Sequence, residues 1–191
     1  MNDLKCEVLS RWARAYTDNR SRFKALIADL DREQAVRQPR KGSWSVAECL
    51  DHLAVTGERY QPLMRAAIDK GRQQGKSGGA PYRRRTMAGR MLLFTLEPGR
   101  TLRVKAPPTF APGRIQGLDI ESVGRRFEAV NGAWHELLEA ADGLALDRVV
   151  LGTPVSALVR VNLAEAFRIH TLHEARHLAQ AERALASLSS V

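Results

Sequence analysis

The pentapeptide His173-Glu174-Ala175-Arg176-His177 is the stretch on which the prediction of fold and site rests. It lies in a segment of high helix propensity, and helical residues four positions apart share one face, about 6 Å apart along the axis. His173 and His177 could therefore hold a divalent metal ion between them. The pentapeptide also matches H-E-x-x-H, the metalloprotease helix in which the Glu is the general base.

The residues that follow do not favour a metalloprotease. In the extended protease motif, a Gly and a third His come after the second His. Here Gln180 and Arg183 occupy these two positions. We therefore expect a third ligand from upstream, where the chain has three more histidines: His52, His135 and His170.

The three upstream candidates differ in their helical placement. His170 shares a face with His173 but lies two turns, about 10 Å, from His177, so one straight helix cannot bring all three to one ion. His135 points about 100° away from the apolar stripe of its segment, which predicts a surface position. His52 lies two turns into another helix, where a lone histidine is more often a hydrogen-bonded core residue than a ligand. Spacing alone leaves the third ligand open.

Taken in order, these motifs resemble the DinB-like (damage-inducible) superfamily of metal-binding four-helix bundles. The matching stretches are Trp44-Ser45-Val46-Ala47-Glu48, Asp51-His52-Leu53, a proline-rich segment from Ala106-Pro107-Pro108 to Pro112, and His173-x-x-x-His177-Leu178-Ala179-Gln180. The resemblance covers essentially the whole chain. It implies an all-α fold, a four-helix bundle with one long crossover between helices two and three. It also implies metal ligation by His52, His173 and His177 but not by His170, and it assigns no role to Glu174.

Apolar residues that recur every three to four positions predict four long helices. These helices are expected over residues 2–36, 45–68, 120–141 and 162–188. Capping residues at Ser45 and Asn162 indicate the starts of the second and fourth. Between the second and third we expect a short helix over 85–96 and an extended stretch over 101–112, a connection long enough for these two helices to run parallel. Residues 142–161 are expected to form a short strand pair or a packed loop, and the chain 1–191 to form a single domain.

The net charge of +9 is concentrated in the crossover, residues 70–118. This segment holds eleven Lys and Arg residues and a single acid, Glu97, so the rest of the chain is close to neutral. The run Arg83-Arg84-Arg85 attracts anions. We consider a solvated loop, a gate that binds an anionic small molecule over the metal site, or a nucleic-acid contact. Only Tyr82 and Phe94 place aromatic rings nearby and no base-reading motif is present, so nucleic-acid binding is not expected.

Three histidines form a neutral ligand set with a definite chemistry. The ion keeps its full charge and acidifies a water molecule or a thiol beside it. Imidazole suits several metals, and we expect one divalent transition-metal ion, Zn, Ni or Fe. The resemblance implies a metal-dependent enzyme that acts on a small molecule, either an S-transferase that uses a low-molecular-weight thiol such as bacillithiol or mycothiol, or a hydrolase. The alternatives are a non-enzymatic, stress-related bundle that binds a metal or ligand, and structural histidines that hold no metal.

Three residues near the histidines have two interpretations each. Glu174 is a candidate general base, but a solvated or salt-bridged glutamate is favoured. Gln180 lies on the same helix face as His173, two turns along, and could orient a ligand or substrate or form a core hydrogen bond. Cys49 could be a fourth ligand, although a buried small apolar residue is favoured.

The composition indicates an intracellular protein. Two cysteines, Cys6 and Cys49, make no disulfide framework. The first residues carry charges where a signal peptide would be apolar, and the longest uncharged window, 149–159, is far shorter than the roughly 18 residues of a membrane helix. We expect a cytoplasmic protein with no membrane span, and a homodimer, since bundles of this class often pair helices about a two-fold axis.

Overall fold

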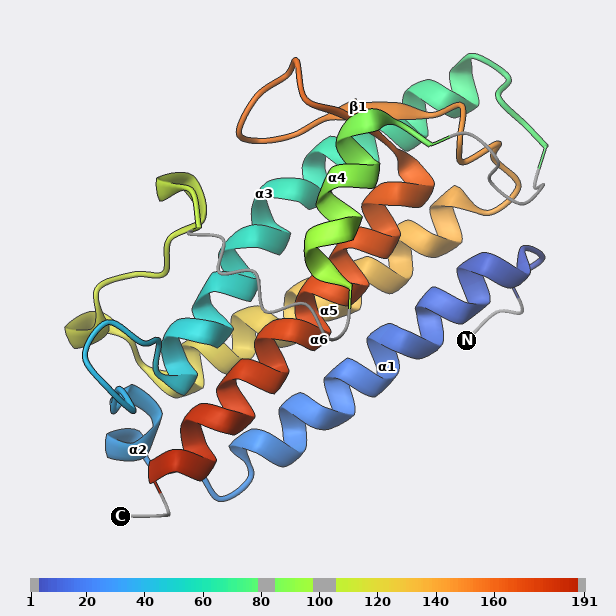
Figure 1. The fold of residues 1–191 in the computed structure, drawn as a ribbon. Helices are drawn as coiled ribbons and strands as arrows, with labels where there is room; N and C mark the ends of the chain where they lie inside the picture. Colours follow the sequence, from blue (N-terminus) through green and yellow to red (C-terminus); the bar gives the residue numbers. More distant parts are fainter. Residues whose placement is uncertain (1–3, 79–84, 98–105, 189–191) are drawn as a thin grey trace.

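Four long helices form the body of the protein. The computed structural model describes residues 4–78, 85–97 and 106–188. Its long helices are α1 (Glu7–Ile27), α3 (Val46–Gln73), α5 (Ile120–Ala141) and α6 (Leu163–Leu188). Figure 1 shows α3 and α5 running in one direction and α1 and α6 in the opposite direction. The predicted four-helix bundle with parallel second and third long helices is thus confirmed.

The connections agree with most of the sequence predictions. The short helix of the crossover is α4 (Met87–Leu96), and the strand pair is β1 (Val150–Gly152) with β2 (Arg160–Asn162), antiparallel. The predicted extended stretch over 101–112 is only partly correct. Residues 101–105 lie outside the described residues, and Pro108–Phe110 form a 3-10 turn, η1, followed by a second one, η2 (Ile115–Gly117).

The first predicted helix, over 2–36, is wrong as a single element. The helix α1 ends at Ile27, and a separate short helix, α2 (Arg32–Val36), follows. Asp31 starts α2, because its side chain accepts a hydrogen bond from the Gln34 N–H at 2.7 Å while the Gln34 side chain accepts one from the Asp31 N–H at 3.4 Å. Such a capping box gives the chain a new helix start where apolar spacing alone predicts continuity.

The other helix starts follow the predicted caps. Ser45 Oγ accepts from the Glu48 N–H at 3.2 Å, and the Glu48 carboxylate accepts from the Ser45 N–H at 2.8 Å. Asn162 and Glu165 make the same reciprocal pair at the start of α6, at 2.8 and 3.0 Å. Because these bonds are local, they set the register of α3 and α6, and with it the direction of each histidine side chain.

The helices α3 and α5 approach closely. A Cβ on Gly57 would lie only 2.2 Å from Cγ1 of Val130, so glycine is required for this contact. The buried core divides into two clusters, one around Trp134 and Phe167 and the other around Phe127 and Leu50. None of the described helices combines the length and apolar character that crossing a membrane requires.

Candidate metal centre

Three histidines from two helices converge. His52 comes from the second turn of α3, and His173 and His177 come from consecutive turns of α6. The ring centroids are 4.9 Å apart for His52 and His173, and 4.6 Å apart for each of the other two pairs. The Nε2 atoms of His52 and His173 are 3.1 Å apart, and each ring offers a nitrogen within 4.8 Å of the others. One ion can therefore be reached by all three residues.

The crossover fixes the orientation of the His52 ring. Nδ1 of His52 lies 2.6 Å from the carbonyl oxygen of Phe110. Because a carbonyl only accepts, Nδ1 carries the proton, and Nε2 is left with its lone pair. The lone pair is on the side of His173, which is the arrangement that a metal ligand needs.

Trp44 covers the histidines at the start of α3. Its ring centroid lies 4.9 Å from that of His52 and 5.6 Å from that of His177. His52 is only 4% exposed, whereas His173 and His177 are half-buried.

The three rings form a neutral donor set. Burial lowers the pKa of all three, that of His177 to about 3. Repulsion by the neighbouring histidines and by Arg176 lowers the pKa of His173 and His177 further, while the hydrogen bond to Phe110 raises that of His52. Neutral imidazoles whose ring nitrogens converge fit a divalent cation, since a ligating nitrogen must carry no proton.

Gln180 lies beside the His177 ring. Its side chain raises the pKa of His177 against the larger effect of burial. Within the described residues, however, Nδ1 of His177 is buried with no partner in good hydrogen-bond geometry. Gln180 is thus close enough to orient the ring, and its role in doing so stays a prediction.

The other two histidines lie outside the group. His135 is half-buried on α5, at the edge of the Tyr16 ring, rather than fully on the surface. His170 is 3% exposed and lies between the rings of Trp134 and Tyr60, with centroid distances of 4.7 and 4.4 Å. Its Nε2 has no hydrogen-bond partner in the part of the chain that the structure describes. Burial lowers the pKa of His170 to about 3.

His170→Phe is expected to make the metal-free protein less sensitive to acid. In the wild type, the unfolded chain binds a proton on His170 at a pKa of 6.5, and the folded chain only at about 3. Stability is therefore complete above pH 6.5 and is lost as the pH falls toward 3. Removing this difference should reduce the loss of stability between pH 7 and 5 by roughly 1–2 kcal/mol.

Urea unfolding followed by circular dichroism at both pH values, with a chelator present, measures this effect. His135→Phe is the matched control, because His135 is only half-buried. Equal losses of stability in His170→Phe and the wild type would contradict the prediction.

Glu174 is not the solvated or salt-bridged residue that its sequence position predicts. It is only 4% exposed and points into the bundle. Its carboxylate accepts hydrogen bonds from Nε1 of Trp134 at 2.8 Å and from Nδ2 of Asn19 at 3.3 Å. Burial raises the pKa of Glu174 to about 8, although these two hydrogen bonds lower it. The error has a physical origin: α6 packs against α1, α3 and α4, so little of its circumference is left for water.

Cys49 behaves as predicted, as a buried apolar residue. It has no exposed surface and belongs to the core cluster around Phe127. Burial raises the pKa of its thiol to about 12, which disfavours the thiolate that metal binding needs. Cys49 is not part of the three-histidine group.

The structure describes only part of the arginine run of the crossover. Arg83 and Arg84 lie outside the described residues, and Arg85 is an exposed residue just before Thr86, the N-cap of α4. The Thr86 N–H and hydroxyl both bind the Glu165 carboxylate, at 2.7 and 2.8 Å, which attaches the start of α4 to the start of α6.

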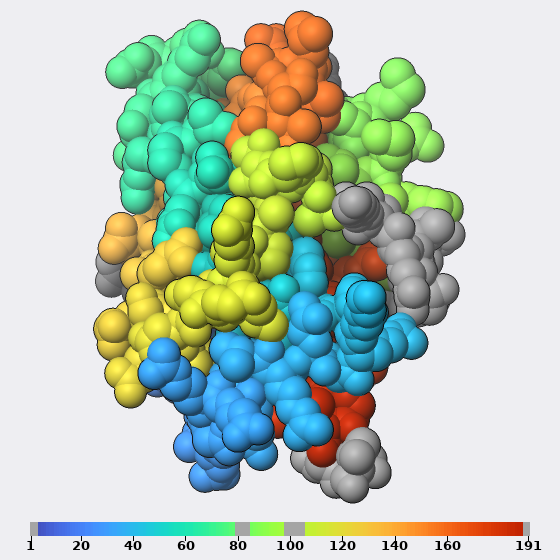
Figure 2. Space-filling model, turned by 90° about the vertical axis from the view of Figure 1, so that its left-hand side faces the viewer, coloured from blue at the N-terminus to red at the C-terminus, as the bar shows by residue number. Residues whose placement is uncertain are grey.

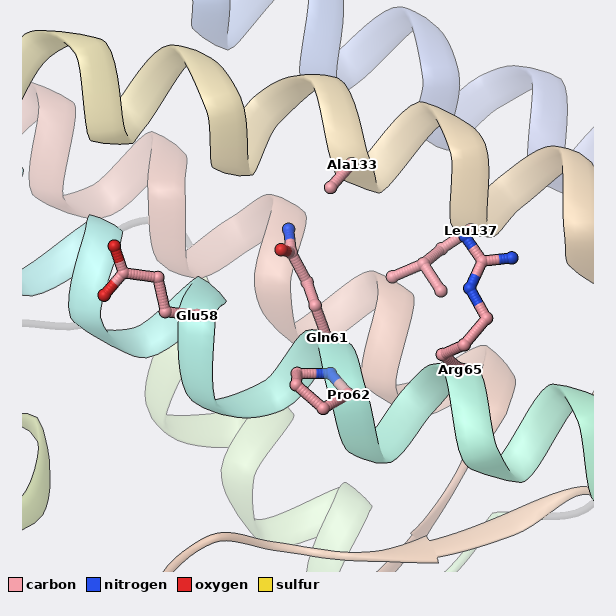
Figure 3. Close-up of a pocket in the computed structure, with 6 residues that line it drawn as sticks. All are labelled: Glu58, Gln61, Pro62, Arg65, Ala133 and Leu137. Atoms are coloured by element: carbon pink, nitrogen blue, oxygen red, sulfur yellow. The ribbon is translucent and has the colours of Figure 1, made fainter.

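A shallow groove between α3 and α5 is separate from the histidines. Figure 3 shows its lining, with Glu58 and Gln61 pointing from α3 toward α5. The groove has a volume of about 370 Å³, and its lining residues are Glu58, Gln61, Pro62, Arg65, Ala133 and Leu137. Because none of the three histidines lines it, the groove is not the entrance to the candidate metal centre.

Fold and site together define a four-helix bundle with a three-histidine group that could bind a metal. A model of the DinB superfamily matches residues 15–181, so the chain belongs to the DinB superfamily, as its motifs predict. Among solved structures, it is similar to YfiT from Bacillus subtilis, described as a probable metal-dependent hydrolase with an unusual four-helix bundle topology. The TM-score is 0.62 at 13% identity, and the match covers 99% of this chain and 92% of that one. No curated protein matches the chain.

Sequence reasoning gave no function to three residues at the site. Trp44 and Asp51 belong to the motifs that resemble the family, but the motifs do not show that Trp44 covers two of the histidines. No feature of the sequence identifies the Phe110 carbonyl as the partner of His52, because every residue carries the same backbone oxygen.

Proposed function

We propose that this chain is a metal-dependent enzyme in which His52, His173 and His177 hold one divalent transition-metal ion. The observation that carries the proposal is the convergence of three neutral imidazoles, whose nitrogens lie within 4.8 Å of one another. A bound ion would supply Lewis acidity at this point and lower the pKa of a water molecule or thiol beside it.

The two acids that adjoin the ligands in the sequence, Asp51 and Glu174, favour thiol chemistry over hydrolysis assisted by a base. Both carboxylate oxygens of Asp51 are engaged, one by the Gly113 N–H at 2.7 Å and one by Arg126. Both oxygens of Glu174 are engaged by Trp134 and Asn19. Both side chains are also buried, with Asp51 2% and Glu174 4% exposed, so we assign neither of them the role of base toward a substrate. A thiol, with a pKa of about 8.5 against about 15.7 for water, needs far less help to lose its proton.

We therefore favour an S-transferase that uses a low-molecular-weight thiol on a small-molecule substrate. A hydrolase is the second candidate, and the similarity in fold to YfiT, described as a probable metal-dependent hydrolase, supports it. The basic crossover supports an anionic thiol or substrate in either case. We propose contacts from Arg83, Arg84 and Arg85, the run that precedes α4 in the sequence, and α4 packs against α6.

A Co²⁺-loaded sample separates the two candidates. If thiol transfer is the function, adding a small thiol should produce new absorption bands in the near ultraviolet, because a thiolate that binds cobalt gives charge-transfer transitions. For thiols that carry carboxylates, affinity should weaken as salt rises from 0.05 to about 0.5 M, since exposed charges are screened. The measurement is a spectroscopic titration with an anionic and a neutral thiol at both salt concentrations.

Two outcomes would change the proposal. No spectral change with any thiol would exclude the S-transferase and leave the hydrolase. Equal salt dependence for anionic and neutral thiols would exclude the arginine contacts while leaving the thiol site intact. His177→Ala is the control, and it should abolish the bands.

A further inference from the structure

The crossover is docked on α3 next to His52. Figure 2 shows the segment 106–119 lying across α3 on the face of the molecule turned toward the viewer. Two consecutive residues of α3 hold it by its backbone. Nδ1 of His52 donates to the Phe110 carbonyl at 2.6 Å, and the Asp51 carboxylate accepts from the Gly113 N–H at 2.7 Å.

Asp51 is a buried carboxylate with two partners. It is 2% exposed, and its second oxygen accepts a hydrogen bond from Arg126 of α5. Arg126 is held in turn by Glu58, two turns further along the same face of α3, through two hydrogen bonds of 2.8 Å. A buried carboxylate is retained only with such compensation. Asp51 thus connects three elements: α3, α5 and the crossover.

The two backbone contacts are mechanically coupled. Only Ala111 and Pro112 separate Phe110 from Gly113, and the proline ring fixes one of the few free torsions between them. The Phe110 side chain is 6% exposed and stacks on Tyr60 of α3. A Cβ on Gly113 would lie 3.3 Å from Leu118 and 3.5 Å from Asp51, so glycine allows the close approach. The contact at Gly113 therefore restrains the Phe110 carbonyl, together with the stacking of the Phe110 ring on Tyr60.

We propose that Asp51 is a positioning residue for the candidate metal centre: by holding the Gly113 N–H, it places the Phe110 carbonyl on Nδ1 of His52 and keeps Nε2 of His52 directed at His173 and His177. The use of the positioned ring, metal binding, rests on the proposed function. The orientation of the His52 ring can be measured without any metal.

The test compares Asp51→Asn with Glu58→Gln by NMR of the metal-free protein. Long-range ¹H–¹⁵N spectra distinguish an imidazole protonated at Nδ1 from one protonated at Nε2. The wild type and Glu58→Gln should show His52 in the Nδ1–H form, because both keep the bond between Asp51 and Gly113. Asp51→Asn should show a mixture of the two forms, because Gly113 and Arg126 bind different oxygens of Asp51 and Asn offers only one oxygen.

A second variant removes the same hydrogen bond from the other side. Gly113→Pro deletes the N–H and puts a ring carbon in its place, next to an Asp51 oxygen 2.7 Å from the nitrogen, so it displaces the crossover while Arg126 still binds the other oxygen of Asp51. It should give the same mixture of His52 forms. A single Nδ1–H form in both Asp51→Asn and Gly113→Pro would overturn the proposal, whether or not the protein binds metal.

Metal affinity gives an independent measurement. With Zn²⁺ and a competing chelator, Asp51→Asn should bind about tenfold more weakly than the wild type, because residues behind metal ligands typically contribute 10–100-fold. Glu58→Gln should bind within about twofold of the wild type. Equal weakening by both variants would indicate a general loss of structure and count against a positioning role. If the wild type binds no Zn²⁺, the proposed function fails and the NMR test of Asp51 still stands.

Discussion

Replacing His52, His173 or His177 with alanine is expected to abolish stoichiometric metal binding. The wild type should carry about one divalent ion per chain, and each variant should bind Zn²⁺ more than about 100-fold more weakly. Each substitution leaves only two of the three nitrogens that can bind the ion. Even residues that only orient a ligand typically contribute 10–100-fold to metal affinity, so the loss of a ligand should cost more. Elemental analysis of tag-free protein purified without chelator gives the stoichiometry, and competition with a chromophoric chelator gives the affinity.

His135→Ala and His170→Ala are the controls for this prediction. His135 lies on α5 outside the group, and His170 lies between Trp134 and Tyr60, so both variants should keep the ion. Retention of metal by His52→Ala together with its loss in His170→Ala would show that the proposed ligand set is wrong.

Glu174→Gln is expected to stabilise the metal-free protein at neutral and alkaline pH. The pKa of Glu174 is 4.5 in the unfolded chain and about 8 in the folded bundle. A raised pKa of this kind contributes stability below pH 4.5 that is lost as the pH rises through 8. The amide resembles the protonated acid and does not ionise. The variant should therefore be more stable than the wild type by roughly 3 kcal/mol at pH 7, and the difference should vanish near pH 4.

Denaturant unfolding at pH 4, 5.5, 7 and 8.5 with a chelator present measures this difference. Glu182→Gln is the matched control on the same helix, because the Glu182 side chain is 41% exposed and pairs with Arg22. Its effect should stay below about 1 kcal/mol at every pH. If Glu174→Gln destabilises the protein equally across the whole pH range, the carboxylate is ionised in the fold and its hydrogen bonds outweigh its burial.

The pH effects predicted for His170 and Glu174 have opposite signs and concern one network of residues. Trp134 donates to Glu174 and stacks on His170, and both titratable groups are buried with no charged partner among the residues that the structure describes. Acid should destabilise the metal-free bundle through His170, and base should destabilise it through Glu174. The two ranges overlap between pH 4.5 and 6.5, where the two effects offset each other, so these groups place the stability maximum of the metal-free protein near about pH 5.5.

The sequence by itself determined the features that depend on local interactions. The helix starts at Ser45 and Asn162 follow from capping boxes, whose partners are three residues apart. The parallel course of α3 and α5 follows from the length of the crossover. His173 and His177 share a face because of their spacing. The apolar periodicity predicted one helix through Asp31, but a capping box at this residue starts a new helix. The cap interrupts an apolar pattern that is otherwise continuous.

Only the tertiary structure decided which residues meet. The position of His52 by itself favoured a core histidine over a ligand, and its approach to within 3.1 Å of His173 depends on the packing of α3 against α6. Glu174 was predicted to be solvated from its place on the helix, but α6 is covered on several sides and turns that residue into the core. The Phe110 carbonyl and the partners of Asp51 come from chain segments 58 to 75 residues away. Contacts over such separations depend on how helices pack, and no local pattern in the sequence records them.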